Sequence, residues 1–284
     1  MNYRHAYHAG NFADVMKHAI LTLILQHLRT KDRPFFLLDS HAGTGRYDLQ
    51  SDEAQKTGEY RDGVARLLAA SSLPPELSGY IEAIAALNGV RHLTPQGLRW
   101  YPGSPEFLRQ ALRPGDRLTA VELHAADGSS LARALAGDRR VSVHHMDGYQ
   151  ALKAFLPPPE RRGLVLVDPP FEARDEFARL ARGLQQAYRR WSTGVYALWY
   201  PIKARRPVDG FLDTVARSGI RRVFVAEQMI TAGDDPERLN GCGLLIVNPP
   251  WQVPAQVGAV LAVLAPMMAQ AGAGRWRADW LVPE

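Results

Sequence analysis

Residues Asp168 to Phe171 form the segment of the chain that is best suited to chemistry on a planar base. The sequence there is Asp-Pro-Pro-Phe. An amino group on such a base is a poor nucleophile, because its lone pair is delocalised into the ring. The Asp168 carboxylate and a main-chain carbonyl held by proline's fixed φ can each accept one amino hydrogen. Phe171 can stack on the base, and stacking of about 1–3 kcal/mol offsets the cost of extruding the base from a helix.

Polar residues also end three further apolar runs. The first run ends in Asp39-Ser40-His41-Ala42-Gly43-Thr44-Gly45, whose glycines allow a tight turn close to a ligand. Glu122 ends the second run and can accept both hydroxyls of a ribose. Asp147 and Gly148 end the third, where the carboxylate can accept an adenine amine and the glycine leaves room for the ring. Each feature alone also fits a tight turn or a helix cap, but together they indicate a ligand containing adenosine.

A second turn, Asn248-Pro249-Pro250-Trp251, has nearly the same form as the first. An asparagine can also accept a hydrogen from an amine. In a doubly wound sheet of seven strands, however, the last strand often returns antiparallel, and its end then lies on the opposite rim. We therefore interpret the Asn248 turn as structural and the Asp168 turn as functional.

The elements that position these residues follow an alternating pattern of strands and helices. Helix-like spacing between the strands, as in Phe177, Leu180, Leu184 and Tyr188, predicts a mainly parallel sheet covered on both faces. Ligands bind at the carboxyl ends of such strands. The seven expected strands are residues 35–41, 118–124, 141–147, 164–168, 195–200, 222–227 and 243–248.

The long gap between the first two strands indicates an insertion. Helical spacing in this gap predicts a small helical subdomain over residues 50–98, between a first part of the core at 1–49 and its remainder at 99–284. The spacing of apolar residues in the segment up to Leu28 predicts an amphipathic helix that is capped near Asn11. Considered by itself, His18 on that helix is typical of a buried core histidine, and Lys17 is typical of a solvated helix residue.

Composition restricts the class of protein further. The chain has 284 residues, a net charge of +5 and one cysteine, Cys242, which excludes an internal disulfide. Its apolar runs are too short to span a membrane, so we expect no membrane partner and a cytoplasmic location. The positive charge favours a polyanionic partner such as nucleic acid. The nine histidines lack the spacing of a metal site, and we predict no metal.

Nearly the whole chain resembles the RlmJ family of 23S ribosomal RNA adenine-N6 methyltransferases, within the class I enzymes that use S-adenosylmethionine. The resemblance rests on YRHAYHAGNFADV at 3–15, LDSHAGTGRY at 38–47, YPGSP at 101–105 and the strand ends above. It implies a Rossmann-like core with an inserted helical subdomain. It also implies that the methyl donor is contacted by His18, His41, Ser104, Glu122, Asp147, Gly148 and Asp168.

The same resemblance implies roles for the substrate side of the site. Asp168 would be the catalytic acceptor for the amine, and Tyr3, His5 and Lys17 would lie over the site and meet the RNA. Phe171 stands where tyrosine is commoner, and the loss of that hydroxyl should leave stacking intact. The sequence therefore predicts a monomeric, RNA-binding methyltransferase that modifies the N6 of one adenine in 23S ribosomal RNA.

Three other functions remain as alternatives at this point. A DNA adenine methyltransferase could use the same residues, but we see no DNA-reading module in the chain. A catalytically silent RNA-binding factor on the same fold would not need the intact Asp168 turn. A nicotinamide dehydrogenase would need the third glycine that the loop after Asp39 lacks.

Overall fold

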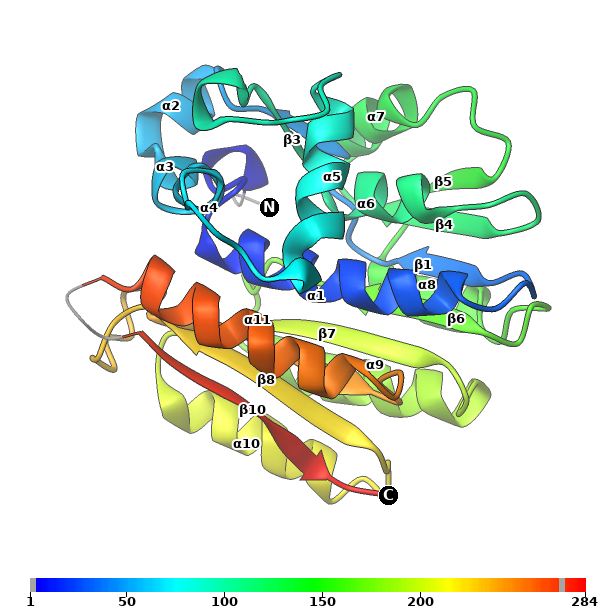
Figure 1. Cartoon of the computed structure of the whole chain (residues 1–284). Helices are drawn as coiled ribbons and strands as arrows, with labels where there is room; N and C mark the ends of the chain where they lie inside the picture. The colour runs from blue at the N-terminus through cyan, green and yellow to red at the C-terminus, as the bar shows by residue number, and fades with distance from the viewer. Residues whose placement is uncertain (1–3, 271–273) are drawn as a thin grey trace.

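An eight-stranded sheet forms the centre of the protein (Figure 1). The computed structural model describes residues 4–270 and 274–284 of the chain. The strand order is β10-β8-β9-β7-β6-β1-β4-β5. The strands are β1 (Phe36–Asp39), β4 (Arg117–Glu122), β5 (Val141–His145), β6 (Gly163–Val167), β7 (Val195–Ile202), β8 (Val223–Met229), β9 (Gly241–Val247) and β10 (Arg275–Val282).

Five neighbouring strands, from β7 to β5, run parallel, which confirms the predicted Rossmann-like α/β fold. All seven expected strands are present, but the predicted number is wrong by one. The eighth strand, β10, pairs antiparallel with β8 at the edge of the sheet. Its sequence mixes arginine, aspartate and tryptophan because it is largely exposed, and it therefore lacks the apolar run that marks the buried strands.

The direction of β9 decides between the two Pro-Pro turns. This strand is antiparallel to both β7 and β8, and Val247 pairs with Tyr196 near the start of β7. Asn248 therefore lies on the rim opposite Asp168, as predicted. Its side chain donates to the carbonyls of Ser192 and Gly194, both at 2.8 Å. Its role is to join two loops at the amino ends of the strands.

Helices cover both faces of the sheet, and a separate hydrophobic core lies on each face. One core contains α1 (Phe12–Arg29), α6 (Ser104–Ala111) and α11 (Val253–Met268), while α7 (Ala125–Ala134) packs beside it on β4 and β5. The other core contains α8 (Gly148–Ala154), α9 (Glu176–Arg190) and α10 (Arg205–Ala216). No helix among the described residues is long and apolar enough to cross a membrane.

Helix α1 begins where the sequence predicted it. The Asn11 side chain accepts hydrogen bonds from the backbone N–H groups of Ala13 and Asp14, which satisfies two donors of the first turn. Nearly every side chain of the helix is buried, since it lies between the sheet and the other helices. The interpretation of Lys17 as a solvated residue is therefore wrong, because only 5% of this residue is exposed.

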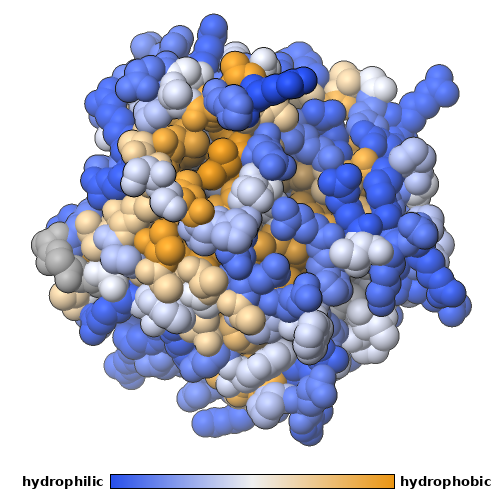
Figure 2. All heavy atoms as spheres, viewed as in Figure 1, coloured by the Kyte–Doolittle hydropathy of each residue, from blue (hydrophilic) through white to orange (hydrophobic). Residues whose placement is uncertain are grey.

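Residues 46–102 leave the core through a two-stranded ribbon, β2 (Arg46–Asp48) and β3 (Trp100–Pro102). Between them lie α2 (Asp52–Thr57), α3 (Glu59–Asp62), α4 (Val64–Leu68) and α5 (Ser78–Leu87), with short 3₁₀ turns at Pro75–Leu77 and Pro95–Gly97. These helices share the core of α1. Figure 2 shows hydrophobic side chains gathered over α4 and the neighbouring part of α11. The subdomain boundaries at residues 50 and 98 stay a prediction.

Candidate functional site

A cavity of about 920 Å³ lies at the carboxyl ends of the parallel strands. It is the size of a site for a cofactor together with part of a substrate. With one exception, every residue predicted for the site lines this cavity. These residues are His5, Lys17, His18, His41, Ser104, Glu122, Asp147, Gly148, Asp168 and Phe171. The exception, Tyr3, lies outside the described residues.

Asp168 follows directly after β6 and is paired with Lys17 of α1. The Lys17 Nζ lies 2.6 Å from Asp168 Oδ2 and 2.9 Å from Asp14 Oδ1. Burial alone would lower the pKa of Lys17, but the Asp14 and Asp168 carboxylates outweigh burial and raise the pKa well above its ordinary value. Lys17 is therefore a fixed positive charge that orients one oxygen of Asp168 and leaves the other oxygen free of this pair.

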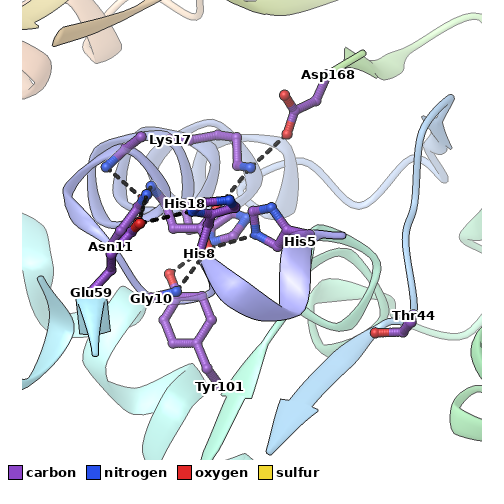
Figure 3. A network of polar contacts seen from close by, with 12 residues as sticks. His5, His8, Gly10, Asn11, Lys17, His18, Thr44, Glu59, Tyr101 and Asp168 are labelled. Atoms are coloured by element: carbon purple, nitrogen blue, oxygen red, sulfur yellow. Dashed lines mark hydrogen bonds and ion pairs between the residues drawn. The ribbon is translucent and has the colours of Figure 1, made fainter. Parts of the chain in front are cut away.

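Asp14 extends this ion pair into the N-terminal motif, and its neighbours His5 and Lys17 are labelled in Figure 3. Its Oδ2 lies 2.9 Å from His5 Nε2 and accepts the backbone N–H of Gly10, also at 2.9 Å. Burial would raise the pKa of Asp14, but His5 and Lys17 lower it well below its ordinary value. A connected chain of charged and polar groups therefore runs from His5 through Asp14 and Lys17 to Asp168.

The helices of residues 46–102 hold the N-terminal motif in place. Glu59 of α3 accepts one hydrogen bond from the Asn11 side chain at 3.0 Å, and its other carboxylate oxygen lies 2.9 Å from His8 Nδ1. The backbone N–H of Val64 donates to the Gly10 carbonyl at 2.9 Å. Gly10 has φ +78°, and a Cβ there would lie 2.9 Å from Val64 Cγ1. A glycine is therefore required where the motif meets α4.

His18 is neutral and has one nitrogen available to a ligand. Its Nδ1 lies 2.8 Å from the Tyr101 hydroxyl, which in turn contacts the Tyr80 hydroxyl. Burial and the neighbouring Lys17 lower the pKa of His18 well below its ordinary value. The Nε2 atom is buried and has no hydrogen-bond partner among the described residues. A buried polar atom that lacks a partner and lines a cavity is suited to bind a polar ligand group.

Asp39 is a member of the site region that the sequence reasoning did not single out. It ends β1, is completely buried, and lies beside the Ser104 hydroxyl. Burial raises the pKa of Asp39 to about 7, although the hydrogen bond from Ser104 opposes the shift. Its position at the end of a buried strand is the sequence signal that could have identified it.

Asp39 should make stability depend on pH in a recognisable way. Because its pKa is raised in the folded state, its contribution is full below about pH 4 and is lost as pH rises towards 7. The difference from an ordinary pKa of 3.8 corresponds to up to about 4 kcal/mol. We expect the free energy of unfolding of wild type to fall between pH 4 and pH 8, and we expect Asp39→Asn to remove the part of this fall that is due to Asp39. Urea unfolding of both proteins at several pH values checks this, and parallel curves would contradict it.

Glu122 and Asp147 both accept hydrogen bonds from backbone N–H groups of loops at this rim, and Glu122 thereby joins its own loop to the loop after β1. Glu122 accepts the N–H groups of Gly43 at 2.8 Å and His124 at 2.7 Å. Asp147 caps α8 by accepting the N–H of Gln150 at 3.0 Å. The capping interpretation is therefore confirmed for Asp147, but it does not exclude ligand binding, because each carboxylate oxygen can accept more than one hydrogen bond.

Gly148 is required by a close approach between two loops. A Cβ at this position would lie 2.3 Å from the Ser40 carbonyl and 2.6 Å from His41 Cε1. The space left by the missing side chain of Gly148 is therefore occupied by the loop after β1. Burial lowers the pKa of His41 to about 4, so its ring is neutral near pH 7. Its Nδ1 lies 2.8 Å from the Ser40 hydroxyl.

Residues of α9 support this side of the cavity and were not predicted. The Tyr149 hydroxyl donates to buried Glu176 at 2.7 Å. Arg179 lies 3.5 Å from Asp147 and places its guanidinium 4.8 Å from the centre of the Tyr149 ring. Helix α9 follows the Asp168 turn, and it therefore connects that turn to Asp147.

Phe171 has a backbone conformation that is uncommon for a large side chain. Its φ is +51°, in the left-handed region that favours glycine. Strained residues of this kind cluster at functional sites, where the surrounding structure holds them. The ring contacts Phe177 and Trp199 edge to face, with centroids 5.0 and 5.9 Å apart. Trp199 of β7 also lines the cavity and was missed, because it lies inside an apolar strand.

Comparison with known proteins gives consistent results. A family model described as ribosomal RNA large subunit methyltransferase D, RlmJ, matches residues 32–282. The chain is 41% identical over 285 residues to ribosomal RNA large subunit methyltransferase J of Escherichia coli (strain K12). It is 38% identical over 284 residues to the protein of that name from Haemophilus influenzae. Both alignments cover 100% of each chain.

A solved structure shares this fold along nearly the whole chain. A protein from Legionella pneumophila str. Philadelphia 1 superposes with a TM-score of 0.87 at 35% identity. The superposition covers 96% of this chain and 98% of that one.

Proposed function

Because the chain belongs to the RlmJ family of ribosomal RNA large subunit methyltransferases, we propose that it transfers a methyl group from S-adenosylmethionine to the N6 amino group of an adenine in 23S ribosomal RNA. The observation that carries the chemistry is the position of Asp168. This carboxylate lines the cavity at the end of β6, next to the strained Phe171 turn and in contact with Lys17.

The residues around the cavity fit the methyl donor. Glu122 and Asp147 end adjacent strands, and their carboxylates can accept the ribose hydroxyls and the adenine amine. His18 Nε2, which is buried and has no hydrogen-bond partner within residues 4–270 and 274–284, and Ser104 are available to the amino-acid part of the donor. When bound, the donor supplies an electrophilic methyl group on a sulfonium. The fit supports the proposed set of seven donor-binding residues that includes His41 and Gly148.

The protein's own residues would align and polarise the amine. Asp168 would accept one amino hydrogen, and a carbonyl of Pro169 or Pro170 would accept the other, which shifts the nitrogen towards tetrahedral geometry. Lys17 would hold the Asp168 carboxylate in one orientation before the base arrives. An exocyclic amine is a very weak acid, and its proton should therefore leave during or after methyl transfer, with Asp168 as the first acceptor.

Replacement of Phe171 tests the stacking contact. We expect Phe171→Ala to raise the KM for RNA by about 10-fold to 100-fold, because base stacking on an aromatic ring is worth about 1–3 kcal/mol. Phe171→Tyr is the matched control and should keep wild-type kinetics, since it retains the ring. Steady-state kinetics with saturating methyl donor measure both. Equal KM values for the alanine and tyrosine variants would show that the ring does not stack on the substrate.

Substrate choice can be tested directly. The protein is incubated with labelled S-adenosylmethionine and either unmodified 23S ribosomal RNA or DNA, and the labelled nucleotide is mapped. Label on N6 of one adenine of the RNA is the expected result. Label on DNA alone would identify a DNA adenine methyltransferase, and no label on either would favour a silent RNA-binding factor. We also expect the enzyme to act as a cytoplasmic monomer.

A further inference from the structure

The cavity continues past Asp168 along β7, away from the proposed donor-binding residues. Asp168 follows Val167, which pairs with Leu198, so Trp199 lies level with Asp168 on the neighbouring strand. Trp199, Pro201 and Lys203 alternate along the extended chain, and all three line the cavity. Side chains two residues apart on a strand share one face. The wall from Trp199 to Lys203 therefore leads outward for about 13 Å, at roughly 3.3 Å per residue.

Two cations lie at the outer end of this wall. Lys203 follows β7, and Arg238 belongs to the loop between β8 and β9. Both are exposed and line the cavity. Across residues 4–270 and 274–284, no ion pair or side-chain hydrogen bond involves Lys203 Nζ or the Arg238 guanidinium. Arg179, on the donor side of the same cavity, is paired with Asp147 and Glu176. Lys203 and Arg238 therefore differ from Arg179, since the charge of Arg179 is already matched by carboxylates of the protein.

The loop that carries Arg238 is held against the end of β7, and the two cations consequently belong to one structural unit. Buried Asn240 donates to the Lys203 carbonyl at 2.6 Å and to the Asp235 carbonyl at 2.7 Å. The backbone N–H of Asn240 donates to the Ile202 carbonyl at 2.9 Å. In Figure 1 this loop lies at the tip of the β8 arrow.

We propose that Lys203 and Arg238 bind the phosphates that flank the target adenosine, so that the base lies between Asp168, Phe171 and Trp199 while its sugar and phosphates follow the wall of β7. The assignment rests on the proposed function and extends it to the RNA backbone. A nucleotide in the cavity must carry its two phosphates out through the mouth, and unpaired lysine and arginine side chains are the groups that bind phosphate oxygens. The four-residue span from Trp199 to Lys203 is comparable with the distance between the base and the phosphate of one extended nucleotide.

The test compares Lys203→Ala, Arg238→Ala and the double variant with Arg139→Ala. Arg139 is also exposed and without a side-chain partner among the described residues, but it precedes β5 on the opposite rim of the sheet. Binding of a 23S ribosomal RNA fragment is measured over a series of salt concentrations, together with KM for RNA, kcat and the Kd of S-adenosylmethionine. Each single cavity variant should weaken RNA binding roughly tenfold. The slope of the logarithm of the binding constant against the logarithm of the salt concentration should become shallower by about 0.7–0.9 for each lost phosphate contact.

The outcomes separate this inference from the proposed function. Loss of RNA affinity in the two cavity variants, with an unchanged Kd for S-adenosylmethionine and unchanged binding by Arg139→Ala, would support the assignment. Wild-type RNA affinity and salt dependence in the double variant would overturn it, even if the enzyme methylates RNA. An equal loss in Arg139→Ala would also overturn it, because the effect would then be one of general charge. A wild-type protein that methylates no RNA would instead reject the proposed function.

Discussion

Asp168→Asn is expected to lower kcat by about 10³-fold to 10⁴-fold, while RNA binding falls much less. The amide keeps the size of the side chain but has one acceptor oxygen in place of two and no negative charge. Lys17 Nζ lies 2.6 Å from Asp168 Oδ2 and would occupy the single acceptor oxygen of the asparagine. The amino hydrogen of the base would then lack an acceptor. Single-turnover methylation with saturating donor and RNA measures the chemical step, and RNA binding is measured separately.

Asn248→Gly is the matched control for this prediction. Asn248 begins the other Pro-Pro turn, has φ +53°, and lies on the opposite rim of the sheet. Glycine tolerates that conformation, although the hydrogen bonds to Ser192 and Gly194 are lost, and this should cost about 1–3 kcal/mol of stability without a loss of kcat. If both variants remained folded and lost activity equally, the choice of Asp168 over Asn248 would be wrong.

The sequence located those site residues that lie at the carboxyl end of a buried strand. The apolar runs located all seven predicted strands, and the antiparallel direction expected for the last one separated Asn248 from Asp168. Side chains at the ends of parallel strands must share one rim. For that reason Glu122, Asp147 and Asp168 could be brought together without knowledge of any contact.

The periodicity of the sequence was uninformative wherever the chemistry depends on contacts between distant elements. Lys17 and Asp168 are 151 positions apart, and nothing in the pattern of α1 shows that its lysine faces the end of β6. Trp199 lies inside an apolar strand and Glu176 begins an ordinary amphipathic helix, so neither has a local signal. The strand β10 was missed because an exposed edge strand has no buried run. In each case the missing information is tertiary packing, which periodicity does not specify.

Lys17→Met should destabilise the protein by about 3–5 kcal/mol at pH 7 and should also lower kcat by at least about 100-fold. The methionine side chain fills much of the same space, but it leaves Asp14 and Asp168 without their shared cation. The side chain of Asp14 is 1% exposed and that of Asp168 is 16% exposed, so water compensates poorly for the lost charge. Removing one partner of a buried ion pair is costly because the other partner stays buried and charged. Denaturant unfolding and single-turnover kinetics measure the two effects.

The pH dependence and a second substitution distinguish charge from packing. The pKa of Asp14 is lowered in the folded state, so the stability that Asp14 contributes is present above its unfolded pKa and is lost as pH falls through the folded value. The gap in unfolding free energy between wild type and Lys17→Met should therefore narrow as pH falls. Adding Asp14→Asn to Lys17→Met should restore part of the stability, because it removes one uncompensated charge, but it should not restore kcat, since Asp168 still lacks its cation. A gap that stays constant with pH, or a double variant less stable than Lys17→Met, would mean that Lys17 acts through packing and not through its charge.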